Sequence, residues 1–307
     1  MIACPELDHH AHPPATVRLG DLEVRRMGYG AMRLPGPDVW GEPEDAAAAR
    51  TVLRRAVDLG VQLIDTAWFY GPMVANRLIA EALHPYPADL VIATKLGSSR
   101  GPDRSWVPAL RPEALRDAIE HDLRSLRRER LDLVHLRWMT ASPVPLAEAL
   151  DCLIALQSEG KLRHIGLSNV GMAELELALA RTPIAAVQNL YNLGGGDGVL
   201  ARRTHCVVDA PEQVLARCER EGIAFLPFFP LAMGTVAQGR GALDEIARFH
   251  DATPAQIALA WLLARSKVML PIPGTRSLAH LEQNWAARRI ALTPEQFEAL
   301  RGAAAQT

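Results

Sequence analysis

Short apolar runs alternate with longer amphipathic stretches over most of the chain of 307 residues. The runs have the length of strands, and in the stretches Ala, Val and Leu recur at helical spacing, so the pattern predicts strands separated by helices. Strands that alternate with helices are typically parallel, with the helices as crossovers. The expected strands are Val24–Gly28, Gln62–Asp65, Leu90–Lys95, Leu131–Arg137, His164–Leu167, Ala185–Asn189, Ile223–Pro227 and Val268–Ile272.

The expected helices begin and end at residues with known positional preferences. Gly60 ends the first, Pro112 suits the first turn of the second, and Thr253 is placed as the N-cap of the last. These helices are Glu44–Leu59, Pro112–Arg128, Leu146–Ser158 and Pro254–Ser266.

Eight strand–helix units in a chain of this length favour an α/β fold of one domain, a closed (β/α)8 or TIM barrel, which needs about 250 residues. A doubly wound open sheet would give a similar order of elements and stays open as an alternative. We expect the barrel to span residues 16–307. Residues 1–15 are expected to be a disordered leader, because chain termini are usually loose. They lack the basic start and apolar run of a signal peptide.

Charge and composition exclude several classes of function. The formal net charge of −2, with arginines scattered among acids, argues against a nucleic-acid partner. No window is apolar for long enough to be a membrane helix. The four cysteines form no CxxC pair, so we expect no disulfide framework, no metal site and a reducing, cytoplasmic environment. No heptad or obvious exposed apolar stripe signals a dimer, and the expected assembly is a monomer or a small homo-oligomer.

Three polar residues are expected to converge at the mouth of the barrel. Asp65 ends one strand, Tyr70 follows it in the loop, and Lys95 ends the next strand. A lone Asp or Lys at a strand end is usually a cap or a solvated charge, but adjacent parallel strands bring these two together. A free tyrosine has a pKa of about 10, and a nearby ammonium should lower it. Such a tyrosine could protonate a carbonyl oxygen as a hydride reaches the carbon.

The segment GGGDG, Gly194–Gly198, opens a long connection after the strand Ala185–Asn189. In a barrel this connection lies at the C-terminal face, where active-site loops are found. It is either a mobile flap over a ligand or an ordinary surface loop, and the sequence favours neither.

Six motifs in order resemble the aldo-keto reductase family and span the chain from Gly28 to Asn284. They are GVQLIDTAWFYG, IATKLG, KLRHIGLSNV, AAVQNLYN, LPFFPLAMG and LPIPGTRSLAHLEQN. The segment GYGAM, the YGP after the tyrosine and PFFPL are similar to the bacterial members of pyridoxal-reductase type. The resemblance implies a (β/α)8 barrel that reduces a small carbonyl compound with NADP(H), plausibly pyridoxal to pyridoxine.

The resemblance also implies roles by position. Tyr70 matches the general acid, Lys95 its partner and Asp65 the carboxylate that pairs with the lysine. Gly30, Met32, Asp65 and Leu231 are expected near the cofactor, with Ser168, Asn169 and Gln188 on the nicotinamide carboxamide and Phe228 stacked on its ring. The adenosine end is expected to contact Gly274, Thr275, Arg276, His280, Gln283 and Asn284.

Elementary chemistry supports the cofactor assignment only in part. The loop at Gly274 leads into a helix, and helix N-termini bind phosphate. Arg276 would read a 2′-phosphate by charge and paired hydrogen bonds, which favours NADPH over NADH. Taken alone, PGTRS is an ordinary loop with a capping serine. The chain also lacks a GxGxxG fingerprint, so the nicotinamide cofactor follows from the resemblance.

The chain departs from the family pattern at the end of the fourth strand, where a histidine is usual. Aligned without a gap, Arg137 stands at that position, and His135 lies two residues earlier on the same strand face. Arg137 could stabilise charge on the carbonyl oxygen or bind an anionic or phenolic group, and it would not readily donate a proton. Alternatively, a distortion brings His135 into the role, or His135 is a packed core residue. We favour Arg137 facing the site.

Aromatic residues are expected to shape the substrate pocket. Trp40, Trp68 and Trp106, with Arg137, are the candidate substrate contacts. A flat aldehyde such as pyridoxal would stack on such walls, although any one tryptophan could serve packing alone.

Two other functions compete with a reductase. A non-catalytic NADP(H)-binding sensor or regulatory subunit fits the loss of the family histidine, but the retained Asp65, Tyr70 and Lys95 argue against it. A barrel hydrolase or isomerase would leave Ser168, Asn169 and the PGTRS loop unexplained, and it should not bind NADPH.

Overall fold

Parallel pairing joins the strands of the main sheet in nearly chain order. The computed structural model describes residues 15–194, 211–234 and 241–304, so the proposed leader up to residue 14 and the glycine-rich connection beyond Gly194 lie outside the described residues. The sheet order is β3-β4-β5-β7-β8-β9-β10, with each neighbouring pair parallel. The strands are β3 (Tyr29–Gly30), β4 (Leu63–Asp65), β5 (Val91–Arg100), β7 (Leu131–Arg137), β8 (Leu162–Ser168), β9 (Ala186–Leu190) and β10 (Ala224–Phe228).

The segment 268–273 closes this sheet into a (β/α)8 barrel. On one side the Phe225 N–H donates to the Val268 carbonyl at 2.8 Å, and on the other the Gly28 N–H donates to the Pro271 carbonyl at 2.9 Å. The predicted strand Val268–Ile272 therefore occupies the eighth position. It is not a regular strand, because Pro271 and Pro273 have no N–H to donate to a ladder, and only a single bridge to Phe225 forms.

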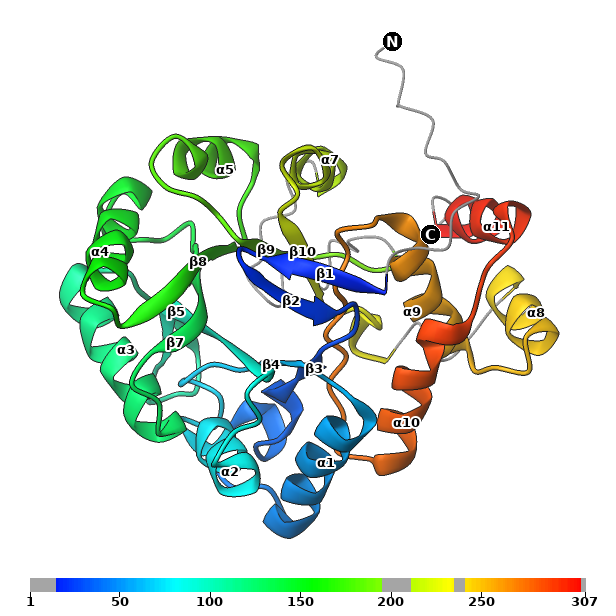
Figure 1. Cartoon of the computed structure of the whole chain (residues 1–307), viewed down its shortest axis with the longest axis horizontal. Coiled ribbons are helices and arrows are strands. Elements are labelled where there is room, and N and C mark those ends of the chain that lie inside the picture. The colour runs from blue at the N-terminus through cyan, green and yellow to red at the C-terminus, as the bar shows by residue number, and fades with distance from the viewer. Residues whose placement is uncertain (1–14, 195–210, 235–240, 305–307) are drawn as a thin grey trace.

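Helices surround the barrel (Figure 1), and the predicted helix ends are correct to within two residues. The Asp45 side chain caps the first helix by accepting from Ala48 N–H, and Thr253 forms a capping box with Gln256. The helices are α1 (Ala46–Leu59), α2 (Val74–Leu83), α3 (Pro112–Leu126), α4 (Leu146–Ser158), α5 (Met172–Leu179), α7 (Pro211–Glu221), α8 (Ala242–Phe249), α9 (Pro254–Arg265), α10 (Leu278–Ala286) and α11 (Pro294–Ala304).

An N-terminal hairpin, β1 (Thr16–Leu19) and β2 (Leu22–Arg25), lies across one end of the barrel (Figure 1). Its apolar side chains pack with those that fill the barrel interior, among them Leu133 and Leu226. The prediction of a single strand at Val24–Gly28 is wrong, because these residues are divided between β2 and the approach to β3. The hairpin covers the N-terminal end of the barrel and leaves the C-terminal ends of the strands for a site.

A second hairpin extends above the opposite end. Strand β5 continues five residues beyond Lys95 and pairs antiparallel with β6 (Trp106–Ala109). The sequence analysis ended this strand at Lys95 and did not foresee the extension.

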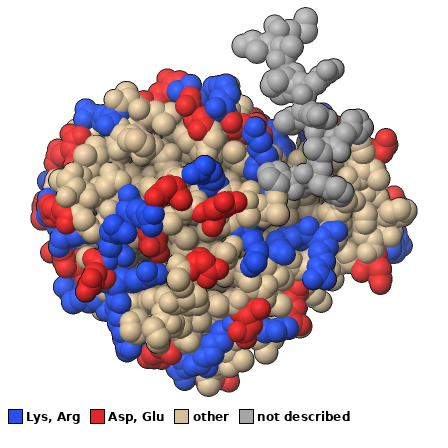
Figure 2. Space-filling model, in the orientation of Figure 1, with Lys and Arg blue, Asp and Glu red and all other residues tan. Residues whose placement is uncertain are grey.

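The surface agrees with the composition. On the face that carries the first hairpin, basic and acidic side chains are interspersed rather than gathered into a basic patch (Figure 2). No helix within the described ranges is long and apolar enough to cross a membrane.

Candidate active site

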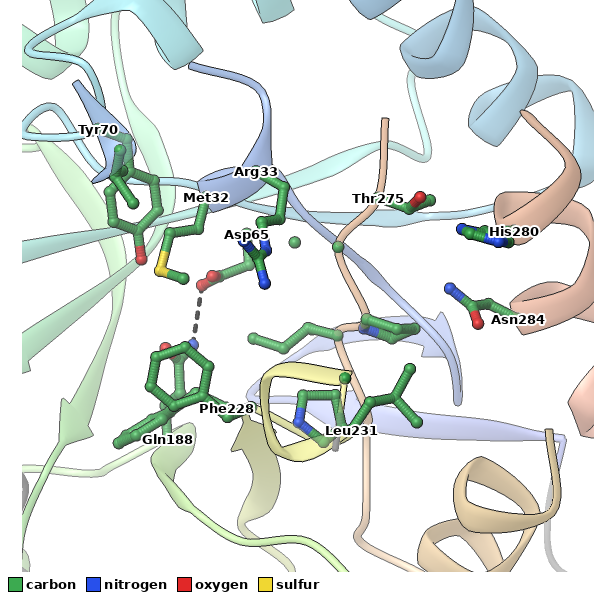
Figure 3. Close-up of a pocket in the computed structure, with 18 of the residues that line it drawn as sticks. Met32, Arg33, Asp65, Tyr70, Gln188, Phe228, Leu231, Thr275, His280 and Asn284 are labelled. Atoms are coloured by element: carbon green, nitrogen blue, oxygen red, sulfur yellow. Dashed lines mark hydrogen bonds between the residues drawn. The ribbon is translucent and has the colours of Figure 1, made fainter. Parts of the chain in front are cut away.

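A cavity of about 750 Å³ lies at the C-terminal ends of the strands and collects most of the predicted site residues. Asp65 and Gln188 face one another toward one end, while Thr275, His280 and Asn284 line the other (Figure 3). The predicted residues on its wall are Gly30, Met32, Asp65, Tyr70, Lys95, Trp106, Arg137, Gln188, Phe228, Leu231, Gly274, Thr275, His280, Gln283 and Asn284. Those that lie off this wall are Trp40, Trp68, Ser168, Asn169 and Arg276.

Lys95 and Asp65 form a buried ion pair, as their neighbouring strand ends predict. The Lys95 Nζ donates to Asp65 Oδ2 at 2.6 Å and to the Thr66 carbonyl at 3.0 Å. Both side chains are almost fully buried. Burial alone would lower the pKa of Lys95, but Asp65 and Tyr70 together outweigh it and hold that pKa above its ordinary value. Lys95 is therefore a fixed cation at neutral pH.

Tyr70 lies beside this cation, with Lys95 Nζ 5.1 Å from the centre of its ring. Burial raises the pKa of Tyr70 above 10.0, although the positive charges of Lys95 and Arg137 act in the opposite direction. The expectation that Lys95 lowers this pKa overall is wrong, because desolvation of a fully enclosed phenol is the larger effect. The hydroxyl thus keeps its proton at neutral pH, as a proton donor must.

Gln188 holds the second carboxylate oxygen of Asp65, the one that Lys95 does not contact. Its Nε2 donates to Asp65 Oδ1 at 2.8 Å, so Asp65 is held from both sides (Figure 3). Ser168 is paired in register between Arg137 and Gln188, both on the cavity wall. Its buried hydroxyl has no hydrogen-bond partner among the residues the structure describes. Asn169 Nδ2 donates to the Trp138 carbonyl at 2.8 Å, which ties the ends of β7 and β8 together.

The structure places Arg137, and not His135, on the cavity wall. The Arg137 guanidinium carbon lies 5.7 Å from the centre of the Phe228 ring. His135 is fully buried deeper in the barrel, in register with Lys95 and against Gly166, where a side chain would collide with the imidazole at 2.7 Å. Burial, together with the charge of Lys95, lowers the pKa of His135 to about 3. His135 is thus a neutral imidazole packed beneath the site.

This burial predicts how stability depends on pH. Unfolding returns the pKa of His135 from about 3 to about 6.5, so the unfolded chain binds the proton first and the free energy of unfolding falls as pH drops below 6.5. Between about pH 7.5 and about pH 5, wild type should lose about 2 kcal/mol more than His135→Asn. Urea unfolding of both proteins at the two pH values checks this. Parallel losses would mean that the imidazole titrates normally in the fold.

The last loop and α10 form the far end of the cavity. The Tyr29 hydroxyl donates to the Thr275 carbonyl at 2.6 Å and so holds the loop against β3. Gly30 and Gly274 lie where these segments meet, and a Cβ on Gly274 would lie 2.4 Å from the Gly30 carbonyl oxygen. Arg276 is exposed outside the wall, beside the first turn of α1.

The tryptophans divide between the wall and its surroundings. Trp106 lines the cavity and packs edge-on against Phe69 at 5.5 Å. Trp68 turns away and stacks on His121 of α3 at 5.7 Å, so the structure does not bring it to the substrate end. Trp40 lies behind the wall, with its ring 5.3 Å from the Arg100 guanidinium carbon.

Sequence reasoning missed two arginines on the wall, Arg33 and Arg100. Arg100 donates to the carbonyls of Asp38 and Val39, both at 3.1 Å, and its guanidinium carbon is 4.3 Å from the Trp106 ring centre. It joins the loop before α1 to the β5–β6 hairpin. The close spacing of Arg100, Arg104 and Trp106 in SSRGPDRSW was the available signal.

The comparisons with known proteins agree with this geometry. A family model described as the aldo/keto reductase family matches residues 26–305. The chain belongs to the aldo/keto reductase family. It is 45% identical over 292 residues to pyridoxine 4-dehydrogenase of Escherichia coli strain K12, covering 94% of this chain and 97% of that one. It is 40% identical over 290 residues to an uncharacterised oxidoreductase of Schizosaccharomyces pombe, with 94% and 90% covered.

Solved structures of the family carry the cofactor. An aldo-keto reductase from Klebsiella pneumoniae in complex with NADPH superposes with a TM-score of 0.75 at 25% identity and covers 94% of each chain. The present aldo/keto reductase is an NADP-dependent oxidoreductase that reduces small carbonyl compounds. Its cavity suits that cofactor: it runs from the Lys95–Tyr70 pair to α10, and the unpaired Ser168 hydroxyl lies between two wall residues. Within the described ranges, no group of three or more His, Cys, Asp or Glu side chains is placed to hold a metal ion.

Proposed function

We propose that this aldo/keto reductase reduces pyridoxal to pyridoxine with NADPH. The observation that carries the proposal is the position of Arg137 on the same cavity wall as an aromatic cluster at the Tyr70 end. The wall is formed by Phe69, Tyr70 and Trp106, whose rings pack edge-on. An aromatic wall suits a pyridine ring, which can contact it by stacking or edge-on. The 45% identity to a pyridoxine 4-dehydrogenase supports the same substrate.

The proton chemistry follows from the buried cluster. When bound, NADPH supplies the hydride for the carbonyl carbon. Tyr70 donates its hydroxyl proton to the carbonyl oxygen, which becomes the alcohol. Lys95 stabilises the phenolate that remains, and Asp65 holds Lys95 with Gln188 behind it. The enclosed cluster excludes water and strengthens each of these interactions.

We propose that Arg137 contacts the phenolic oxygen next to the aldehyde of pyridoxal. An aromatic hydroxyl ortho to an aldehyde and meta to a ring nitrogen loses its proton easily, and a guanidinium binds the resulting anion with paired donors. A histidine at this position would offer one donor and would be neutral at pH 7 in a buried place. The departure from the family pattern would then select a phenolic substrate.

Replacement of Arg137 should separate phenolic from neutral aldehydes. A hydrogen bond to a charged group is worth about 1.5–3 kcal/mol, so Arg137→Ala should lower kcat/KM for pyridoxal about 10- to 100-fold more than for 4-nitrobenzaldehyde. Arg137→Lys keeps the charge but lacks the paired donors of the guanidinium, so its kcat/KM for pyridoxal should lie between those of wild type and Arg137→Ala. Steady-state kinetics with both aldehydes measures the difference. An equal loss for both would assign Arg137 to the carbonyl oxygen of any substrate.

The direct test of the proposal follows NADPH oxidation by absorbance, with pyridoxal and with 4-nitrobenzaldehyde as a generic control. A higher kcat/KM for pyridoxal supports it. Turnover of the control alone leaves a reductase with another substrate and rejects pyridoxal.

We further propose that Arg276 and the α10 residues His280, Gln283 and Asn284 hold the adenosine end of the cofactor. Arg276 is exposed two residues before α10 and follows Thr275, which lines the cavity. Arg276→Ala should raise KM for NADPH about 10-fold or more and leave KM for NADH unchanged, since NADH lacks the phosphate. An equal change for both cofactors would contradict this role.

We also propose that the enzyme acts in the cytoplasm, because the two cysteines that the structure describes, Cys152 and Cys218, are free thiols. A monomer or a small homo-oligomer stays the prediction for its assembly, and light scattering measures it.

A further inference from the structure

A buried polar network lies on the outer side of the barrel wall, directly behind the Asp65–Lys95 pair. Successive residues of a strand point to opposite faces, so Thr94 points outward where Lys95 points inward. The network also contains Thr66, Asn76 of α2 and Asp122 of α3. None of these four side chains is exposed to solvent.

Asp122 joins the two strand ends that carry the ion pair. Its Oδ2 accepts from the Thr94 hydroxyl at 2.8 Å, and its Oδ1 accepts from Asn76 Nδ2 at 2.6 Å. Asn76 Oδ1 in turn accepts from the Thr66 hydroxyl at 2.8 Å. One carboxyl group is therefore linked to the residue after Asp65 and to the residue before Lys95.

The network also reaches the ammonium itself, because Thr66 presents its carbonyl to Lys95 Nζ at 3.0 Å. Fixing Thr66 from behind therefore fixes one of the two acceptors that orient the cation. The barrel wall here is thin, and the charge of Lys95 acts on Asp122 through it.

We propose that Asp122 is a positioning residue that holds the Asp65–Lys95 pair in place from behind the barrel wall. It touches neither the cavity nor the reacting atoms. It acts through Thr94 and through the Asn76–Thr66 link, so that α2 and α3, and not only the strands, set the position of the ammonium beside Tyr70.

The carboxyl group also carries a charge that can report on this link. Burial raises the pKa of Asp122 to about 7, against the hydrogen bonds of Thr94 and Asn76 and the charge of Lys95, which lower it. Asp122 should therefore ionise near neutral pH, while Lys95, whose pKa is above its ordinary value, stays protonated. The other titratable groups near this link are Asp65 beyond the wall, His121 on α3, and His135, which lies beside Thr94 and Lys95 and has a pKa lowered to about 3 by burial.

The chain offers a direct probe, because it contains three lysines: Lys95, Lys161 and Lys267. With lysine labelled with ¹³C at Cε, NMR resolves each one, and Lys161→Arg and Lys267→Arg assign the signals. In the full-length protein the Lys95 signal should shift with a midpoint near pH 7. The shift should vanish in Asp122→Asn and persist in His121→Gln.

Kinetics tests the positioning role with 4-nitrobenzaldehyde, so the result does not depend on pyridoxal as the substrate. Asp122→Ala removes both links and should lower kcat about 10-fold, with the NADPH Kd within about 2-fold of wild type, because small displacements of reacting groups are costly. Asp122→Asn can still bond to Asn76 and Thr94 and should recover most of kcat. Tyr86→Phe, which deletes a different, partly buried hydrogen bond to α3 at the Leu126 carbonyl, is the matched control and should keep full kcat.

Two results would overturn the proposal. One is a folded Asp122→Ala protein with the kcat of wild type, since a merely structural role would change stability alone. The other is a Lys95 signal that lacks the pH 7 inflection in wild type or retains it in Asp122→Asn. The second result can be obtained even if Asp122→Ala fails to fold.

Discussion

Tyr70→Phe should lower kcat about 10²- to 10⁴-fold while the Kd for NADPH stays within about 2-fold of wild type. The change removes one hydroxyl from a buried ring and leaves its packing against Phe69 and Trp106 in place. The pKa of Tyr70 is held above 10.0, so the wild-type hydroxyl is protonated throughout the neutral range and can be the acid. Phenylalanine has no proton to give.

The measurement is single-turnover reduction of an aldehyde, with NADPH binding followed separately by fluorescence. Tyr86→Phe is the matched control, because the Tyr86 hydroxyl donates to the Leu126 carbonyl away from the cavity. Turnover of Tyr70→Phe at the wild-type rate would assign the acid to another group. Loss of NADPH binding would mean that the substitution had disturbed the cavity itself.

Lys95→Met should remove turnover and also destabilise the fold by about 3–5 kcal/mol. The side chain is replaced by one of similar length, so the loss comes from Asp65, which remains a buried carboxylate without its cation. Gln188 still donates to Asp65, but one amide cannot offset the desolvation of a charge.

The double variant Asp65→Asn/Lys95→Met separates the two effects. It removes both charges and should recover most of the lost free energy of unfolding, since an uncharged pair costs little to bury. Turnover should stay absent, because no cation stabilises the Tyr70 phenolate. Guanidinium unfolding gives the stabilities and NADPH oxidation gives the rates. A double variant as unstable as Lys95→Met would mean that packing, and not charge, holds this part of the core.

The sequence predicts the Asp65–Lys95 ion pair better than it predicts the side chains around that pair. Asp65 and Lys95 end adjacent parallel strands, and that local fact alone brings them together. The direction of the Tyr70 pKa needed the depth of burial, which depends on loops from several parts of the chain. Trp68 follows the end of β4 just as Tyr70 does, but the turn after β4 points its ring at His121 of α3. No pattern within QLIDTAWFYG predicts the direction in which the Trp68 ring points.

Two predictions about strands were wrong for similar reasons. The N-terminal hairpin turns at Gly20, whose φ is 64°, and its two strands are only four residues long, too short for an alternation signal. The eighth strand position is filled by a segment in which Pro271 and Pro273 prevent a regular ladder. At both places the backbone conformation is determined by burial and by the neighbouring backbone, and not by local strand propensity.

The hairpin across the N-terminal end of the barrel also determines on which side ligands enter and leave. With that end filled by Val17, Leu19 and Val24 against the interior side chains, cofactor and carbonyl compound share the opening at the opposite end. Product and spent cofactor must therefore leave on the same side by which the substrate and NADPH entered, so the two occupants of the cavity can obstruct one another in each catalytic cycle.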